Sequence, residues 1–280
     1  TVLQGGNFDG TIGVIGAIEA VRMIKESNLS VQRNVDVVVF TSEEPVSFGL
    51  GCLGSRALAG GLKYEDTLKL KNQEGEILHQ VLQARGFNLD DFSNLNRYPG
   101  TVKAYLELHI EQGAVLEELG VPLGIVSTIC APTDIHISVI GKQGHAGATP
   151  MNLRRDAMMA SAEIALYIEN LVKRSASPHT VGTIGRLNVF PNASNFIPQR
   201  VDFTIDIRDS IFEVKEKIVK DLSSYIEEIK IRRKVEIKMD ILNHDIPQSC
   251  DPDIVDLLQR ICESKQMPFH TMVSGAYHDA

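Results

Sequence analysis

The sequence predicts an α/β protein in which a mainly parallel sheet is interrupted by an inserted domain with a different strand pattern. Residues 35–40 are apolar and mostly β-branched, which is typical of a strand buried on both faces of a parallel sheet. Between residues 129 and 246 the strands instead alternate apolar and polar residues, the pattern of a sheet with one exposed face. We therefore expect one domain from residues 1–128 and 247–280, and a second domain from residues 129–246.

Composition excludes several classes of protein. The 280 residues carry a formal net charge of −8 and 43% hydrophobic residues, so we expect neither the basic face of a nucleic-acid-binding protein nor a disordered chain. No apolar run approaches the roughly 18 residues of a membrane helix. The four cysteines are scattered without CxxC spacing, which favours reduced thiols and a cytoplasmic protein. Residues 1–3 run directly into a Gly-rich turn and residues 277–280 follow no terminal helix, so we expect a piece of a longer chain.

The first element is a turn at residues 5–10, followed by a helix whose apolar face begins at Ile12. Asp9 lies just before this helix. The turn by itself favours an N-cap for Asp9; the alternative is a carboxylate ligand that bridges two cations.

The predicted strand at residues 35–40 ends at two adjacent carboxylates, Glu43 and Glu44, followed by Pro45. Ligands of open α/β sheets bind at the carboxyl ends of strands. The pair is therefore either a solvated turn, or a cation ligand beside a residue that acts on substrate. Residues 49–61 are Gly-rich and predict a closely packed helix, while residues 63–97 predict polar helix with a solvated face.

Two further predicted strands also end in polar residues. Residues 102–110 alternate and reach His109, with a helix expected at 114–119. A helix at 251–262 precedes a short strand at 268–273, which leads to His278 and Asp279. Imidazole and carboxylate together suit divalent cations, so four such positions on one class of sheet edge indicate a dinuclear metal site.

The inserted domain has the order β-α-β-β-α-β, the ferredoxin-like pattern. Its expected strands are residues 134–140, 179–189, 200–208 and 235–242, and its expected helices are residues 153–172 and 211–229. One sheet face is covered by helices and the other is exposed. Such a domain offers its sheet edge and helix as dimerisation surfaces.

Six short motifs resemble the M20-type metallopeptidase superfamily. They are GNFDG, TSEEP, ELHIEQG, GHAGATP, NASNFIP and SGAYHDA, in the same order along nearly the whole chain. Within the superfamily they are similar to the branch of N-carbamoyl-L-amino acid hydrolases, β-alanine synthases, allantoate amidohydrolases and ureidoglycolate amidohydrolases.

The resemblance implies a catalytic domain with two divalent metal ions, Zn or Mn, with Ni as a further candidate. Asp9 would bridge both ions, Glu44 and His278 would complete one site, and His109 would serve the other. A further His-x-Asp motif is expected before Thr1. Glu43 would be the general base that accepts the proton of the attacking water.

The inserted domain would supply the substrate contacts. The resemblance implies that His145 polarises the substrate carbonyl, from the partner subunit of a homodimer, and that Asn195 and Arg208 bind a substrate carboxylate. Gln112 matches a further substrate-contacting position. The residues themselves leave alternatives open: Asn195 shapes a turn, and Arg208 pairs with Asp206 or Asp209.

The predicted function is hydrolysis of a linear amide C–N bond in a ureido compound that carries a carboxylate, with release of ammonia. Pro45 after the glutamate pair and Tyr277 resemble the ureidoglycolate type, whereas Gly275 and the GHAGATP loop resemble the carbamoylase and allantoate types. The alternatives are an M20 aminoacylase or dipeptidase, and an inactive dimeric binding protein on the same scaffold. The expected partners are a small ureido molecule and a second copy of the chain, with no nucleic acid and no membrane.

Overall fold

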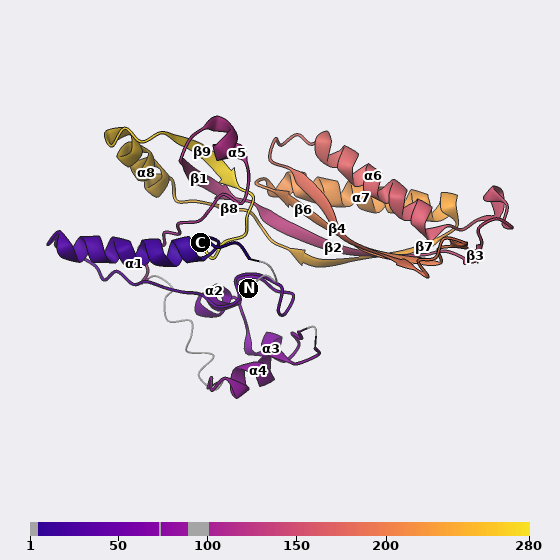
Figure 1. Ribbon diagram of the computed structural model, residues 1–280, viewed down its shortest axis with the longest axis horizontal. Coiled ribbons are helices and arrows are strands. Elements are labelled where there is room, and N and C mark those ends of the chain that lie inside the picture. Colours follow the sequence, from indigo (N-terminus) through magenta and orange to yellow (C-terminus); the bar gives the residue numbers. More distant parts are fainter. Residues whose placement is uncertain (1–4, 73, 89–100) are drawn as a thin grey trace. The chain divides into compact units, whose positions relative to one another are not determined.

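The computed structural model describes residues 5–72, 74–88 and 101–280 (Figure 1). The chain divides into two compact units. The first lies within residues 1–112 and 277–280, and the second comprises residues 113–276. Among the described residues, no helix has the length and apolar character needed to cross a membrane.

The first unit is mainly helical and irregular. Helix α1 (Thr11–Glu26) confirms the predicted first helix. Helix α2 (Leu53–Leu58) occupies part of the Gly-rich segment, and α3 (Tyr64–Thr67) and α4 (Leu78–Ala84) are the short helices of the polar segment that follows. The predicted end of that segment, residues 89–97, lies outside the described residues. Leu53, Leu62 and Leu78 form a small buried cluster in this unit.

The prediction of two strands in this unit is wrong. Residues 35–40 and 102–110 have no strand assignment, and Val39 and Leu106 are 66% and 68% exposed. A strand requires a hydrogen-bonded neighbour, and neither segment has a ladder partner among the described residues. Their apolar composition is real, but composition alone does not supply the neighbouring strand.

The second unit contains a small sheet with the order β8-β1-β9. Strand β1 (Leu123–Ile129) runs parallel to β9 (Phe269–Ser274) and antiparallel to β8 (Gln248–Ser249). Strand β1 was not predicted from the sequence. Helices α5 (Val115–Leu119) and α8 (Pro252–Ser264) match predicted helices. The Asp251 side chain accepts hydrogen bonds from two backbone N–H groups at the start of α8, which explains why the helix begins there.

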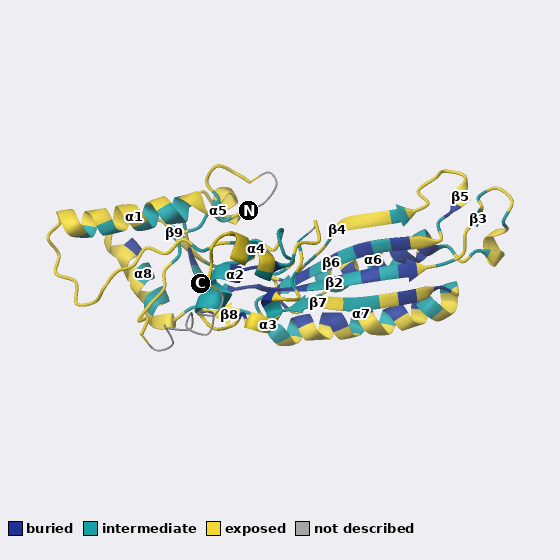
Figure 2. Ribbon diagram, turned by 90° about the horizontal axis from the view of Figure 1, so that it is seen from below, coloured by how far each residue is buried: buried dark blue, intermediate teal, exposed yellow. Residues whose placement is uncertain are grey.

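The larger sheet of this unit is antiparallel, with the order β4-β6-β2-β7. Its elements follow the predicted β-α-β-β-α-β order, and their bounds are β2 (Ala131–Ile140), α6 (Ala157–Lys173), β4 (Val181–Phe190), β6 (Arg200–Asp209), α7 (Phe212–Arg233) and β7 (Glu236–His244). Both helices cover the same face of the sheet (Figure 2). Alternate residues of β2 and β6 are therefore buried against them, including Ile135, Ile137, Phe203 and Ile205. The intervening residues form the open face.

A two-stranded ribbon lies beyond one end of the larger sheet (Figures 1 and 2). Strand β3 (Gly144–His145) pairs with β5 (Phe196–Ile197), with His145 opposite Phe196. A 3₁₀ helix (Met151–Leu153) follows in the same loop. The ribbon places the GHAGATP and NASNFIP motifs next to each other, although 50 residues separate His145 from Asn195 in the chain.

Candidate metal centre and catalytic residues

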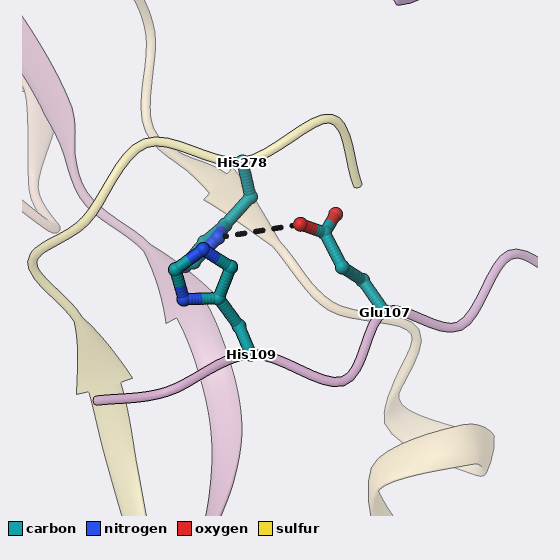
Figure 3. A group of neighbouring side chains, drawn as sticks. All are labelled: Glu107, His109 and His278. Carbon is teal, nitrogen blue, oxygen red and sulfur yellow. Dashed lines mark ion pairs between the residues drawn. The ribbon is translucent and has the colours of Figure 1, made fainter. Parts of the chain in front are cut away.

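Three side chains of the first unit could hold a metal ion. One donor atom from each of Glu107, His109 and His278 lies within 4.8 Å of the other two (Figure 3). The two imidazole rings meet edge to face with their centroids 4.6 Å apart, and His278 Nδ1 lies 3.7 Å from Glu107 Oε1. Two imidazoles and a carboxylate are a donor set that suits Zn²⁺ and neighbouring divalent metals.

His109 is oriented for coordination through Nε2. Its Nδ1 lies 2.7 Å from the carbonyl oxygen of Ile110, which can only accept, so Nδ1 carries the proton. In the neutral ring, Nε2 then presents a lone pair towards Asp9 Oδ1, 3.3 Å away. A cation between these two acceptors would be bound by both lone pairs. The residues present therefore fit a metal ion.

Asp9 is not a helix cap. The N-cap of α1 is Gly10, and no side chain caps that helix. The Asp9 carboxylate instead faces His109 and accepts a hydrogen bond from the Gln112 side chain. Gln112, expected as a substrate contact, contacts Asp9 in this structure.

Glu43 occupies an acidic and half-buried position. Burial, followed by the nearby carboxylates of Glu44, Asp279, Glu107 and Asp9, raises its pKa to about 7. This value suits a group that accepts and returns a proton near neutral pH. Glu107 behaves differently. Burial acts to raise its pKa, but the His278 hydrogen bond and the charges of both histidines outweigh burial and lower it.

Two residues depart from the predicted ligand set. Glu44 is not part of the three-residue group, although it is close enough to Glu43 to affect its charge. Glu107 is part of the group and was missed. Its signal was present in the sequence, because Glu107 and His109 are two residues apart, and alternate residues of an extended segment share a face.

In the second unit, the structure brings His145 and Asn195 together. The backbone N–H of Ala146 donates to the carbonyl of Asn195 across the β3–β5 ribbon, at 2.9 Å. The His145 ring is exposed, and its Nδ1 accepts from the backbone N–H groups of Gly147 and Ala148, at 3.1 and 3.2 Å. In the neutral ring the proton therefore lies on Nε2, which leaves Nε2 as a hydrogen-bond donor.

Arg208 lies at the other end of β6, away from this ribbon. Its Nε and Nη2 donate to the Asp206 carboxylate at 2.8–3.1 Å, and its Nη1 donates to the carbonyl of Gly275 at 2.8 Å. The pairing with Asp206, one of the two alternatives read from the sequence, is thus confirmed. The guanidinium also lines a cavity of about 480 Å³ on the open face of the sheet.

Comparisons with known proteins place the chain in a family. Residues 5–280 match peptidase family M20/M25/M40, and the chain belongs to this family. It is 40% identical over its full length to an N-carbamoyl-L-amino acid amidohydrolase of Geobacillus stearothermophilus, of which it covers 68%. It is 37% identical, over 98% of its length, to a ureidoglycolate hydrolase of Arabidopsis thaliana, of which it covers 59%.

Solved structures agree with this assignment. A crystal structure of AtUAH in complex with glyoxylate is similar with a TM-score of 0.85 and 37% identity, covering 98% of this chain and 66% of the other. A hydantoinase/carbamoylase family amidase from Burkholderia multivorans is similar with a TM-score of 0.84 and 30% identity, covering 99% and 66%. The chain thus spans about three fifths to two thirds of the proteins that it matches.

Proposed function

We propose that this protein is a metal-dependent amidohydrolase that cleaves a linear C–N bond of a ureido or N-carbamoyl compound bearing a carboxylate, and releases ammonia. The observation that carries the proposal is the group of two histidines and a carboxylate beside Glu43, a carboxyl group with a pKa of about 7. The relatives support the substrate class, since they are named as hydrolases of N-carbamoyl-L-amino acids and of ureidoglycolate.

The metal site would use Asp9, His109, His278 and Glu44, joined by Glu107. The site would hold two divalent cations, Zn or Mn, with Ni as a further candidate. When bound, they would supply Lewis-acid activation of water and of the substrate carbonyl. The acidic surroundings that raise the pKa of Glu43 also favour cations at this place.

Glu43 would act as general base and then as general acid. It accepts the proton of the attacking water and delivers it to the leaving nitrogen. His145 Nε2, fixed as a donor by the two backbone N–H groups at Nδ1, would donate to the carbonyl oxygen as negative charge develops there. Asn195 would act beside it, and Arg208 would bind the substrate carboxylate.

The separation of these groups supports a homodimeric site. Arg200 opens β6 next to the β3–β5 ribbon, and Arg208 lies eight residues further along the strand. At about 3.3 Å per residue, this corresponds to about 26 Å. One small ureido acid cannot contact Arg208 and the His145–Asn195 ribbon of the same subunit. We therefore propose that residues 129–246 form a lid and dimerisation domain, and that the partner subunit completes each site.

Hydrolysis assays test the proposal. The purified protein, loaded with Zn²⁺ or Mn²⁺, would be assayed for ammonia release from allantoate, ureidoglycolate and N-carbamoyl-L-amino acids, with a dipeptide and an N-acetyl amino acid as comparisons. Turnover of a ureido compound, reduced about 10²–10⁴-fold in Glu43→Gln with unchanged metal content, is expected. Turnover confined to the dipeptide or the acetyl compound would instead show an aminoacylase or dipeptidase. Metal binding without any of these activities would count against the proposed substrates, and absence of metal binding would support the binding-protein alternative.

A further inference from the structure

The open face of the larger sheet carries an arrangement of charges that the proposed function does not explain. Asp134 on β2 and Asp206 on β6 are directly opposite each other in the antiparallel register. Both line the cavity of about 480 Å³ that Arg208 also lines, together with Thr183 and Thr204. Two carboxylates face one guanidinium, so the net charge beside the cavity is negative and would repel the carboxylate of a substrate.

Asp206 nevertheless makes specific hydrogen bonds with Arg208, in addition to its electrostatic effect on the cavity. Its carboxylate lies along the Nε–Nη2 edge of Arg208, in the two-point geometry of an arginine–carboxylate pair. The two residues are neighbours on the open face, at positions i and i+2 of one strand. Asp206 thereby holds the guanidinium in the wall of the cavity, where Nη1 also donates to the carbonyl of Gly275.

Asp134 lies across the strand pair from Asp206 and provides the contrast. Burial, followed by the Asp206 charge, raises the pKa of Asp134, while Arg208 and the Asn243 side chain act in the opposite direction. Arg208 donates hydrogen bonds to Asp206 and to the carbonyl of Gly275, whereas it acts on Asp134 as a nearby charge. The two carboxylates therefore have a similar electrostatic effect on the cavity, but different contacts with Arg208.

We propose that Asp206 is the positioning residue of Arg208, and that it determines the specificity for carboxylate-bearing substrates by fixing the orientation of the guanidinium in the wall of the cavity. This inference rests on the proposed role of Arg208 in the ureido hydrolase. Without Asp206 the guanidinium regains rotational freedom, and that freedom must be lost again when substrate binds. With Asp206 in place, the guanidinium has already lost this rotational freedom when the chain folds.

The test compares two isosteric variants that remove the same charge from the same cavity, Asp206→Asn and Asp134→Asn. The substrates are the N-carbamoyl amino acid that the wild type hydrolyses best and the corresponding α-amide, which lacks the carboxylate. We expect Asp206→Asn to raise KM for the acid at least about tenfold, to change kcat less than about threefold, and to leave KM for the amide unchanged. We expect Asp134→Asn to leave KM for the acid unchanged or to lower it, because one repulsive charge is removed.

If both variants lower KM for the acid, Asp206 acts only through its charge and the proposal is wrong. Asp206→Glu, which keeps the carboxylate, is expected to recover part of the affinity. Asp202→Asn is the geometric control, since Asp202 pairs with Arg200 in the same i, i+2 arrangement at the far end of the same strand. It is expected to change no kinetic constant, and thermal unfolding checks that all variants fold.

A measurement independent of turnover separates this proposal from the function on which it rests. The Nε–H signal of Arg208 in a ¹⁵N–¹H NMR spectrum, assigned by its loss in Arg208→Lys, is expected to exchange slowly with solvent in the wild type and in Asp134→Asn. It is expected to exchange rapidly in Asp206→Asn. An unchanged signal in Asp206→Asn would overturn the positioning role even if the enzyme proves to be an amidohydrolase. A changed signal with no hydrolysis of any ureido acid would reject the proposed function and retain the contact.

Discussion

The proposed two-subunit site makes a quantitative prediction for mixed dimers. His145 and Arg208 belong to the same folded unit, but His145 lies on the β3–β5 ribbon beyond one end of the larger sheet. Arg208 lies near the other end, about 26 Å along β6 from Arg200. If each site takes one of these residues from each subunit, His145→Ala and Arg208→Ala should complement each other. Each variant by itself is expected to lose nearly all activity.

The magnitude follows from counting. Random reassortment of equal amounts of the two variants gives about half heterodimers, and in each heterodimer one of the two sites has both residues intact. The mixture should therefore recover about a quarter of wild-type activity. The double variant His145→Ala/Arg208→Ala, mixed with wild type, provides the control, because its heterodimers contain no site with both residues intact.

The assay is ammonia release after the two variants have been dissociated and reassembled together, with subunit exchange verified by native mass spectrometry of one isotopically labelled partner. Recovery of activity in proportion to the heterodimer fraction is expected. Verified heterodimers without activity would show that one subunit supplies both residues. That result would refute the argument from the strand length.

Three further predictions concern the metal centre and the stability of the fold. His109→Ala is expected to weaken metal binding by more than the 10–100-fold that is typical of removing an outer-shell partner. The control His136→Ala, on the larger sheet, should bind metal as the wild type does. Metal content after dialysis against a graded chelator measures both variants, and equal retention would count against His109 as a ligand. Leu222→Ala removes a fully buried side chain beneath the larger sheet and should lower the free energy of unfolding by about 2–5 kcal/mol in a denaturant titration. Leu257→Ala on α8, where the side chain is half exposed, should lower it far less. A similar loss of stability in both variants would contradict the place of Leu222 in the core. Glu163→Gln should cost about 1 kcal/mol at pH 7, because Glu163 pairs with Arg232 and Arg233, and the hydrogen bond from Arg232 lowers its pKa. Because the pKa of Glu163 is lowered in the folded state, this stabilisation is present above the ordinary glutamate pKa of 4.5 and is lost as the pH falls through the folded pKa. The thermal unfolding temperatures of variant and wild type should therefore converge in acid. A temperature difference that grows in acid would contradict the lowered pKa.

Local patterns in the sequence were sufficient for the helices and for the larger sheet. The apolar face that begins at Ile12 became α1, and the alternation in residues 134–140 and 200–208 became β2 and β6 in contact with each other. These features depend on periodicity within one segment, which the residues themselves specify. The same reasoning failed for residues 35–40 and 102–110. Their strand character depends on a hydrogen-bonded neighbour, and that neighbour is not a property of the segment.

The motifs likewise identified most of the candidate site by residue type. Asp9, Glu43, His109 and His278 were named from the sequence, and the structure brings Asp9 to His109 and His109 to His278. Glu107 was missed because a carboxylate within a predicted strand does not stand out among the 36 acidic residues of the chain. Its participation depends on the distance to His278, 171 positions later, and only the folded chain sets that distance.

The sequence by itself therefore determined the family, the helices, the larger sheet and the chemical types in the site, since all of these are encoded in short segments and their order. The tertiary structure decided which groups meet. It paired Arg208 with Asp206 and fixed the donor nitrogen of His145. It also placed Arg208 at one end of the larger sheet and His145 on the ribbon beyond the other end. Such relations arise because strand register and side-chain packing convert separations along the chain into distances in space, and no local pattern contains that conversion.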